Sequence, residues 1–184
     1  MDETDGVLLA RARQGDEAAF LTLYRRHRIP TFRFAYRMTS SPAAAEDIVQ
    51  ECFLSLLGRD AFDGRQSCLR TYLFGIVRHL AWKQARLSER ETEEVEDAVD
   101  VIDPLRDLLA SERAGMVERA IAGLPLLQRE ALVLFEYEEL SLEEISAITG
   151  VDVGAVKARL FRARESLRRK LAPLVAPCAE GSCG

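Results

Sequence analysis

The feature that most constrains this chain is a strongly acidic segment near its middle. Between Glu89 and Asp107, nine residues are acidic and two are arginines. A segment with so much charge of one sign and so few apolar residues cannot bury a core, and it is typical of a linker. We therefore expect a domain at residues 5–87, an acidic linker at 88–106, a second domain at 107–172 and a tail at 173–184.

Both predicted domains have the periodicity of helices. Apolar residues recur at spacings of three and four, and Val, Ile and Thr never form the alternating runs that strands show. A length of 184 residues, of which 48% are hydrophobic, is enough for two small cores. The sequence therefore predicts an all-α fold of two small helical domains joined by a flexible acidic linker.

Within the first domain, "SSPAAAEDIVQECFLSLL" predicts a helix that begins with a serine cap and a proline in its first turn. An earlier helix starts near Phe20, and Pro30 is expected to kink or restart it. A third helix is expected from about Leu69 to Arg86. In the serine-capped helix, one face is apolar, and the opposite face carries Asp47, Gln50, Glu51 and Leu54.

The second domain contains a helix-turn-helix pattern. Ser141 and Glu144 form a capping box, and Gly150 marks the end of that short helix. Asp152 is placed to cap a longer helix that begins at Val153. A short helix, a turn with glycine and a longer basic helix are together typical of a DNA-binding motif.

The last helix has two distinct faces. Val156, Leu160 and Ala163 are spaced to face a core. From 157 to 170 there are seven Lys or Arg residues and one Glu, a balance that suits a polyanion but also an ordinary solvated surface. Small residues near its start allow close approach to a major groove, and cations one turn later reach phosphates or guanine. The expected reading face consists of Gly154, Lys157, Ala158, Phe161 and Arg162, with Arg159 at its edge.

Other kinds of function have little support in the sequence. No apolar run approaches the roughly 20 residues of a membrane helix, and the N-terminus is acidic where a signal peptide is basic, so we expect a cytoplasmic protein without membrane insertion. No nucleotide-binding glycine loop, metal-ligand cluster or nucleophile-base pattern occurs, so we expect no catalysis, cofactor or small-molecule substrate. Cys178 and Cys183 are weak candidates for a redox pair or two metal ligands in the tail.

The sequence resembles the extracytoplasmic-function sigma factors of bacterial RNA polymerase. "LPLLQREALVLFEYEELSLEEISAITGVDVGAVKARLFRARESLRRKL" resembles the promoter-binding domain of this family. "AEDIVQECFLSLL" resembles its polymerase-binding helix, and "AFDGRQSCLRTYLFGIVRHLA" resembles its segment for the upstream edge of the melted promoter. The two sets occur in the expected order and cover nearly the whole chain.

The resemblance implies a role for each of these surfaces. Asp47, Gln50, Glu51 and Leu54 would grip the coiled coil of the largest polymerase subunit, and the reading face of the last helix would contact the minus-35 element. Phe62 and His79 align with positions that handle the minus-10 element. We expect the cations near them to hold the displaced strand: Arg65, Arg70, Arg78 and Lys83.

The chain also departs from the family, which usually has Trp, Arg and Asn where Tyr72, Gly75 and His79 stand. These changes leave the preferred minus-10 sequence open. The implied function is promoter-specific initiation of transcription, in a stress or envelope response, with core polymerase, double-stranded promoter DNA, the melted non-template strand and an anti-sigma factor as partners. The alternatives are an autonomous helix-turn-helix regulator and a thiol-based sensor that acts through protein contacts.

Overall fold

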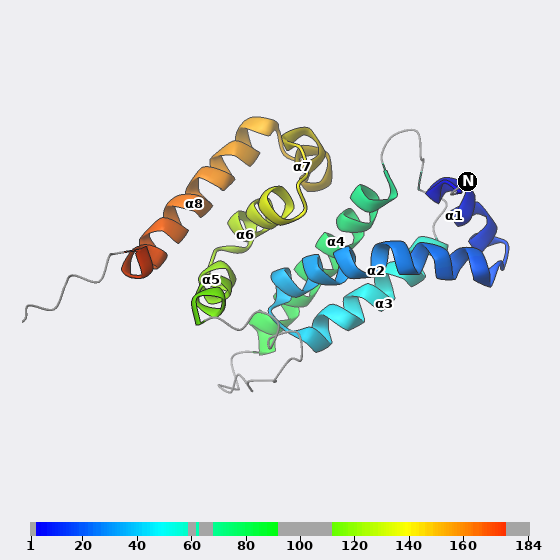
Figure 1. Cartoon of the computed structure of the whole chain (residues 1–184), viewed down its shortest axis with the longest axis horizontal. Coiled ribbons are helices and arrows are strands. Elements are labelled where there is room, and N and C mark those ends of the chain that lie inside the picture. The colour runs from blue at the N-terminus through cyan, green and yellow to red at the C-terminus, as the bar shows by residue number, and fades with distance from the viewer. Residues whose placement is uncertain (1–2, 59–61, 63–67, 92–111, 176–184) are drawn as a thin grey trace, which may run out of the picture.

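A computed structural model shows two groups of helices that lie side by side (Figure 1). It describes residues 3–58, 62, 68–91 and 112–175, and every regular element in those ranges is helical. The all-α expectation is therefore confirmed. The first group consists of α1 (Asp5–Arg13), α2 (Glu17–Thr39), α3 (Pro42–Gly58) and α4 (Leu69–Glu91). The second group consists of α5 (Glu112–Ala122), α6 (Leu126–Leu132), η2 (Val133–Tyr137), α7 (Leu142–Thr149) and α8 (Val153–Val175).

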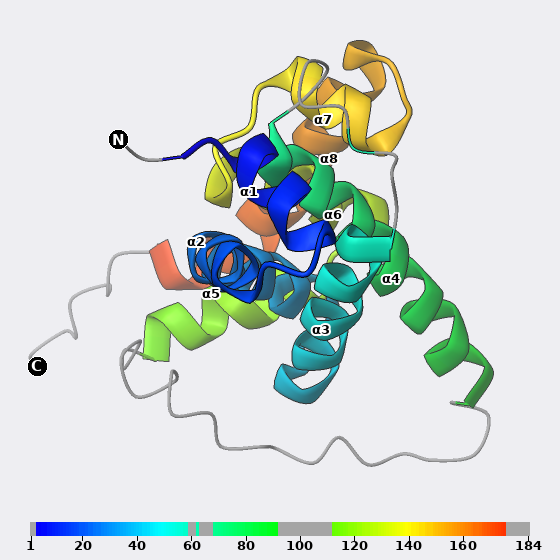
Figure 2. The ribbon, with the colours of Figure 1, turned by 90° about the vertical axis from the view of Figure 1, so that its right-hand side faces the viewer.

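The core of the first group forms where α2, α3 and α4 meet (Figure 2). Phe34 of α2 and Phe74 of α4 are fully buried, and their rings meet edge to face with centroids 5.2 Å apart. Leu23, Leu56 and Leu73 are also fully buried. Burial of each such side chain contributes about 1.5–3 kcal/mol, so this aromatic and aliphatic cluster holds the three helices together.

Helix α2 continues through Pro30 instead of restarting there. Asp16 caps its first turn by accepting a hydrogen bond from the Ala19 amide at 3.0 Å. Just after the proline, the Thr31 hydroxyl donates to the His27 carbonyl at 2.6 Å. Proline inside a helix costs about 3 kcal/mol or more, yet α2 packs against α1, α3 and α4 along its length. That packing outweighs the local cost, so α2 does not restart at Pro30, and of the two expected outcomes only a restart is excluded.

The serine cap of α3 is confirmed. The Ser41 hydroxyl accepts a hydrogen bond from the Ala44 amide at 3.3 Å, and Pro42 occupies the first helical position. Helix α4 runs to Glu91, beyond the Arg86 expected from the sequence. Glu and Arg are good helix formers, so the charge that prevents burial does not by itself end a helix.

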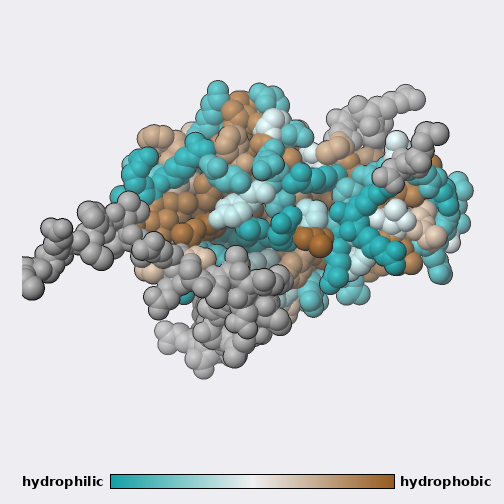
Figure 3. All heavy atoms as spheres, in the orientation of Figure 1, coloured by the Kyte–Doolittle hydropathy of each residue, from teal (hydrophilic) through white to brown (hydrophobic). Residues whose placement is uncertain are grey.

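In the second group, the segment that follows Pro125 is not one regular helix. Helix α6 ends at Leu132, and a π-helical turn, η2, follows it before Glu139 adopts a left-handed φ of 55°. Ile145 of α7 and Val156, Leu160 and Ala163 of α8 pack on this unit and are buried. In Figure 3, hydrophobic side chains gather on the surface where α5 and α8 lie, while most of the rest of that face is hydrophilic.

The two groups also contact each other. Helix α4 packs against α7, and α2 packs against α5, α6 and η2 (Figures 1 and 2). None of the described helices combines the length and apolar character needed to cross a bilayer. The predicted linker lies largely between the described ranges. Helix α8 extends to Val175, so the first residues of the predicted tail, 173–175, belong to this helix, and the rest of the tail lies beyond the described residues.

Candidate nucleic-acid interface

The helix-turn-helix is built from short-range contacts that the sequence predicted. The Ser141 hydroxyl accepts from the Glu144 amide at 3.1 Å, and the Glu144 carboxylate accepts from the Ser141 amide at 2.8 Å. Gly150 has a φ of 71°, which favours glycine, and it ends α7. Asp152 then accepts from the Ala155 amide at 3.0 Å and caps α8. The capping box, the glycine stop and the aspartate cap are all confirmed.

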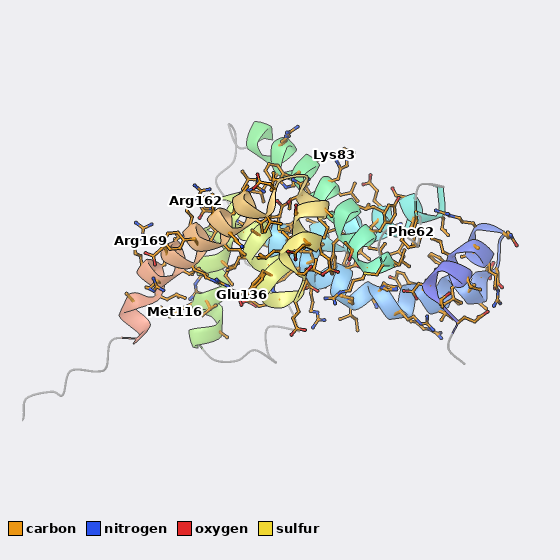
Figure 4. All side chains as sticks on the ribbon, turned by 90° about the horizontal axis from the view of Figure 1, so that it is seen from above. Phe62, Lys83, Met116, Glu136, Arg162 and Arg169 are labelled. Atoms are coloured by element: carbon orange, nitrogen blue, oxygen red, sulfur yellow. The ribbon has the colours of Figure 1, made fainter. Side chains whose placement is uncertain are left out.

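The two faces of α8 are separated as the spacing indicated. Val156, Leu160 and Ala163 are buried, whereas Phe161 is 67% exposed. A side chain at Gly154 would lie 2.9 Å from a carboxylate oxygen of Asp152, so glycine there protects the cap of the helix. Figure 4 shows Arg162 and Arg169 extending outward from α8. The exposed residues of the expected reading face are Gly154, Lys157, Ala158, Phe161 and Arg162.

Arg159, which was expected at the edge of that face, is turned inward. Its side chain is only 14% exposed, and its Nη1 atom lies 3.6 Å from Oε2 of Glu130. Glu130 is fully buried on α6 and also accepts from Nε of Arg78 at 2.5 Å and from Nε1 of Trp82 at 3.1 Å. One carboxylate therefore joins α4, α6 and α8.

The minus-10 candidates on α4 fall into two sets. His79 and Lys83 are exposed, and Figure 4 shows Lys83 pointing away from the helix. Arg70 and Arg78 are instead engaged by carboxylates of the second helical group: Nη2 of Arg70 donates to Oε2 of Glu138 at 2.9 Å and to its carbonyl at 2.7 Å. Glu138 is 1% exposed.

The loop before α4 is described only in part. Phe62 is half-buried, and its ring packs against that of Tyr72 with centroids 5.2 Å apart. Arg65 lies outside the described residues. Tyr72, His79 and Lys83 line a cleft of about 490 Å³, which α7 borders with Ala147 and Ile148. The cleft therefore forms between the two helical groups.

A separate surface lies on α3. Asp47, Gln50, Glu51 and Leu54 are all exposed, and Leu54 has an exposed fraction of 62%. Gln50 and Leu54 also border a cleft of about 340 Å³ between α2 and α3. Its walls are aromatic and are formed by Phe20, Tyr24, Phe32 and Phe53. This face combines acidic groups with an exposed apolar residue, which suits a protein partner better than DNA.

The cysteines show no sign of a metal centre in the part of the chain that the structure covers. In those ranges, no three or more His, Cys, Asp or Glu side chains gather where they could hold a metal ion. Burial raises the pKa of the Cys52 thiol to about 12, so this thiol is unreactive, while Cys68 is exposed. Cys178 and Cys183 lie beyond the described residues.

Sequence reasoning did not identify Glu130, Glu138 or Trp82 as members of this region. The one available signal was a glutamate in the otherwise apolar run "EALVLF", since a carboxylate at a core position must find a partner. That partner is distant: Glu130 and Arg78 are 52 positions apart, and Glu138 and Arg70 are 68 positions apart.

Comparisons with known proteins agree on one family. The family model described as Sigma-70 region 2 matches residues 23–91, and that described as Sigma-70, region 4 matches residues 114–167. The chain is 33% identical over 186 residues to the ECF RNA polymerase sigma-E factor of Escherichia coli, covering 94% of this chain and 96% of that protein. It is 30% identical over 187 residues to the RNA polymerase sigma-H factor of Pseudomonas aeruginosa, with the same two coverages.

Solved structures show the same likeness. The sigma factor RpoE of Bartonella quintana, in complex with the anti-sigma factor NepR, superposes with a TM-score of 0.67 at 30% identity, over 78% of this chain and 90% of that one. CnrH, in complex with the cytosolic domain of CnrY, superposes with a TM-score of 0.70 at 25% identity, over 93% of this chain and 99% of that one.

Proposed function

Because this chain belongs to the extracytoplasmic-function (ECF) family of RNA polymerase sigma factors, we propose that three of its surfaces divide the work of promoter-specific initiation. The exposed face of α3 binds core polymerase, α4 and the loop before it contact the minus-10 element, and α8 reads the minus-35 element. The same division assigns residues 5–87 and 107–172 to two functional domains joined by the linker at 88–106.

The observation that carries the minus-35 assignment is the outer face of α8. Phe161 is 67% exposed in the middle of a basic helix, where burial would otherwise be expected for an aromatic side chain. It lies beside Lys157 and Arg162, on the second helix of a capped helix-turn-helix. In such motifs the second helix enters the major groove, where Arg pairs with guanine and an apolar side chain contacts the thymine methyl.

For the minus-10 element, we propose that binding energy opens the strands. Each unstacked base step costs a few kcal/mol, and stacking of a base on an aromatic side chain returns about 1–3 kcal/mol. Phe62, His79 and Lys83 are the groups best placed to hold the displaced strand, since they are partly or fully exposed. This mechanism requires no catalytic group, so we assign the chain a non-enzymatic role.

On α3, an acidic and apolar face supports binding to a basic coiled coil. Asp47, Gln50 and Glu51 lie one turn or less apart and are all exposed. Leu54, one turn further along, adds an exposed apolar side chain whose burial against a partner would be favourable. We assign this face to the largest subunit of core polymerase.

We further propose that an anti-sigma factor holds this chain until a stress or envelope signal releases it. Two similar structures, those of RpoE and CnrH, were solved in complex with NepR and CnrY. The absence of a membrane-spanning helix among the described residues fits a cytoplasmic location, where both polymerase and promoters are found.

Transcription in vitro tests the proposal. Purified chain is added to core polymerase and a library of genomic promoter fragments, and RNA 5′ ends are sequenced. We expect initiation at a small set of promoters that share a minus-35 and a minus-10 element, and none with core polymerase alone. Binding to DNA without transcription would instead favour an autonomous regulator, and thiol-dependent effects without DNA binding would favour a sensor.

A further inference from the structure

Two buried carboxylates form a polar contact between the helical groups. Glu130 is fully buried and Glu138 is 1% exposed, and both belong to the second group. The cations that neutralise them come from the first group: Arg78 lies 2.5 Å from Glu130, and Arg70 lies 2.9 Å from Glu138. A buried carboxylate is costly unless it is paired. Glu138 depends on this contact for its partner, whereas Glu130 faces both Arg78 of the first group and Arg159 of its own.

The contact extends across α2. Nη1 of Arg129 donates to the carbonyl of Met38 at 2.8 Å, and the guanidinium of Arg37 lies 4.1 Å from the centre of the Tyr137 ring. Burial lowers the pKa of Arg129, in keeping with a position inside the contact. The interface therefore combines cations, carboxylates and backbone carbonyls with apolar side chains, since one buried apolar cluster runs through both groups. Domains joined by a contact that is not wholly apolar can separate.

The same arginines are candidates for DNA contact. A guanidinium that is paired with a buried carboxylate has its charge offset and part of its N–H donors occupied, so it binds a phosphate less tightly. Arg70 and Arg78 are expected to hold the melted strand, and Arg159, which also faces Glu130, is expected at the minus-35 element. The second group also lies beside the minus-10 side of α4, since Ile148 of α7 borders the cleft that His79 and Lys83 line.

The minus-35 face is unaffected by the contact. Lys157, Phe161 and Arg162 stay exposed on α8. Figure 4 shows Arg162 extending outward from this helix. The packed arrangement therefore engages two arginines of the minus-10 surface, on which His79 and Lys83 stay exposed, and leaves the minus-35 surface open.

We propose that this arrangement is a closed state of the free chain, in which Glu130 and Glu138 occupy the arginines of the minus-10 surface in place of DNA phosphates. Opening returns Arg70 and Arg78 to water or to DNA, while Glu130 keeps Arg159 of its own group as a partner. Polymerase binding and strand melting then proceed from the open state. The DNA part of this inference rests on the proposed function, whereas the closed state itself does not.

The test compares the full chain with the double variant Glu130→Gln/Glu138→Gln, which keeps the side-chain volumes and removes both charges. Without polymerase, we expect the variant to bind a labelled non-template minus-10 oligonucleotide more tightly. If the closed state holds about 90% of the free chain, the gain is about tenfold. Binding of a minus-35 duplex is expected to stay within about twofold, because that face is open in both states.

A second variant controls for the loss of negative charge. Glu136→Gln/Glu143→Gln removes two exposed carboxylates from the same helical group. Glu136 pairs with Arg164 inside that group, so this change leaves the contact between the groups intact. We expect it to bind the oligonucleotide like the wild-type chain. An equal gain in both variants would show a general charge effect and overturn the proposal.

X-ray scattering of the free proteins measures the closed state without DNA or polymerase. We expect a larger radius of gyration for Glu130→Gln/Glu138→Gln than for wild type. Because Glu130 also faces Arg159 within its own group, the single variant Glu138→Gln, which leaves that pair intact, must change in the same direction. Unchanged scattering in both variants overturns the closed state, whatever the outcome of the transcription assay.

Discussion

Arg159 shows how the environment of one side chain depends on a residue that is distant in sequence. Its position in the sequence predicts that it lies at the edge of the DNA-reading face of α8 and contacts DNA. In the structure, only 14% of its side chain is exposed, and it faces Glu130. Helical spacing gives the direction in which a side chain points. It does not predict which side chain of another helix lies in that direction.

At the same scale, Arg162 provides the sharpest test of base reading. We predict that Arg162→Ala weakens binding of the preferred promoter by about 1–3 kcal/mol, or about five- to 150-fold. The variant should also lose the ability to distinguish bases at one minus-35 position, and at no other. Competition binding with promoters substituted one base pair at a time measures this. Arg169→Ala is the control: it is exposed further along α8, and its loss should weaken all sequences equally. A uniform loss for Arg162→Ala would make Arg162 a phosphate contact.

Asp47 tests the polymerase face. We predict that Asp47→Lys reduces recovery of core polymerase in a pull-down at least tenfold, because a like charge at an interface costs several kcal/mol. Asp47 is exposed, so the thermal stability of the chain should not change. The matched charge reversal Glu143→Lys, on α7, should leave recovery unchanged. Normal recovery with Asp47→Lys would refute the assignment.

Cys52 makes stability depend on alkaline pH. Its pKa is raised by burial from about 9 to about 12, so the unfolded chain loses this thiol proton at lower pH than the folded chain. Stability is therefore fully present below pH 9 and falls above it, by at most about 1.4 kcal/mol per pH unit for this group. Urea unfolding between pH 8 and 10.5 measures the slope. Cys52→Ala should flatten it, and an unchanged slope would contradict the prediction.

At the scale of elements, the helix-turn-helix owes its geometry to its ends. The capping box of α7, the left-handed glycine that ends it and the aspartate cap of α8 fix the angle at which α8 leaves the turn. Helix α8 can then bury one face and expose the other. By contrast, α2 continues beyond Pro30, because its packing against other helices outweighs the local cost of a proline inside a helix.

Two glycine substitutions with opposite effects test this view. Gly150→Ala places a side chain at a φ of 71° and should destabilise the chain by about 1 kcal/mol. Gly115→Ala, inside α5 and with only an ordinary contact to Arg119, should stabilise it by about 0.5–1 kcal/mol. Thermal unfolding measures both changes. Effects of the same sign would show that backbone conformation does not dominate at Gly150.

At the scale of the whole molecule, the two helical groups meet through a contact that combines charged pairs with apolar side chains. That contact joins α2 and α4 to α6, η2 and α7, and it includes the buried Glu130. If the chain reaches two separate promoter elements, as we propose, it needs two units that can part. The contact therefore has to be strong enough to form and weak enough to release.

Calorimetry tests the coupling between the groups. We predict one unfolding transition for the wild-type chain and two for Arg37→Ala/Glu138→Gln, which removes one contact on α2 and one at the end of η2. The control Arg33→Ala/Glu136→Gln makes the same two kinds of change at exposed positions and should keep a single transition. Two transitions in the wild type would contradict a coupled closed state.

The sequence by itself determined the helical class, the capped helix-turn-helix and the two faces of α8. These features depend on residues within a turn or two of each other: Ser141 with Glu144, Gly150 alone, and apolar residues at three- and four-residue spacing. The family resemblance added roles for the exposed positions. The π-helical turn and the passage of α2 through Pro30 could not be predicted, since both depend on packing.

Only the tertiary structure decided how the two groups meet. Glu130 and Glu138 sit in or beside an apolar run, and their partners on α4 are 52 and 68 positions away. No local pattern pairs them, because the cost of burying a carboxylate is offset only when a distant arginine arrives in three dimensions. Which arginines are available to DNA in the free chain is for that reason a property of the fold.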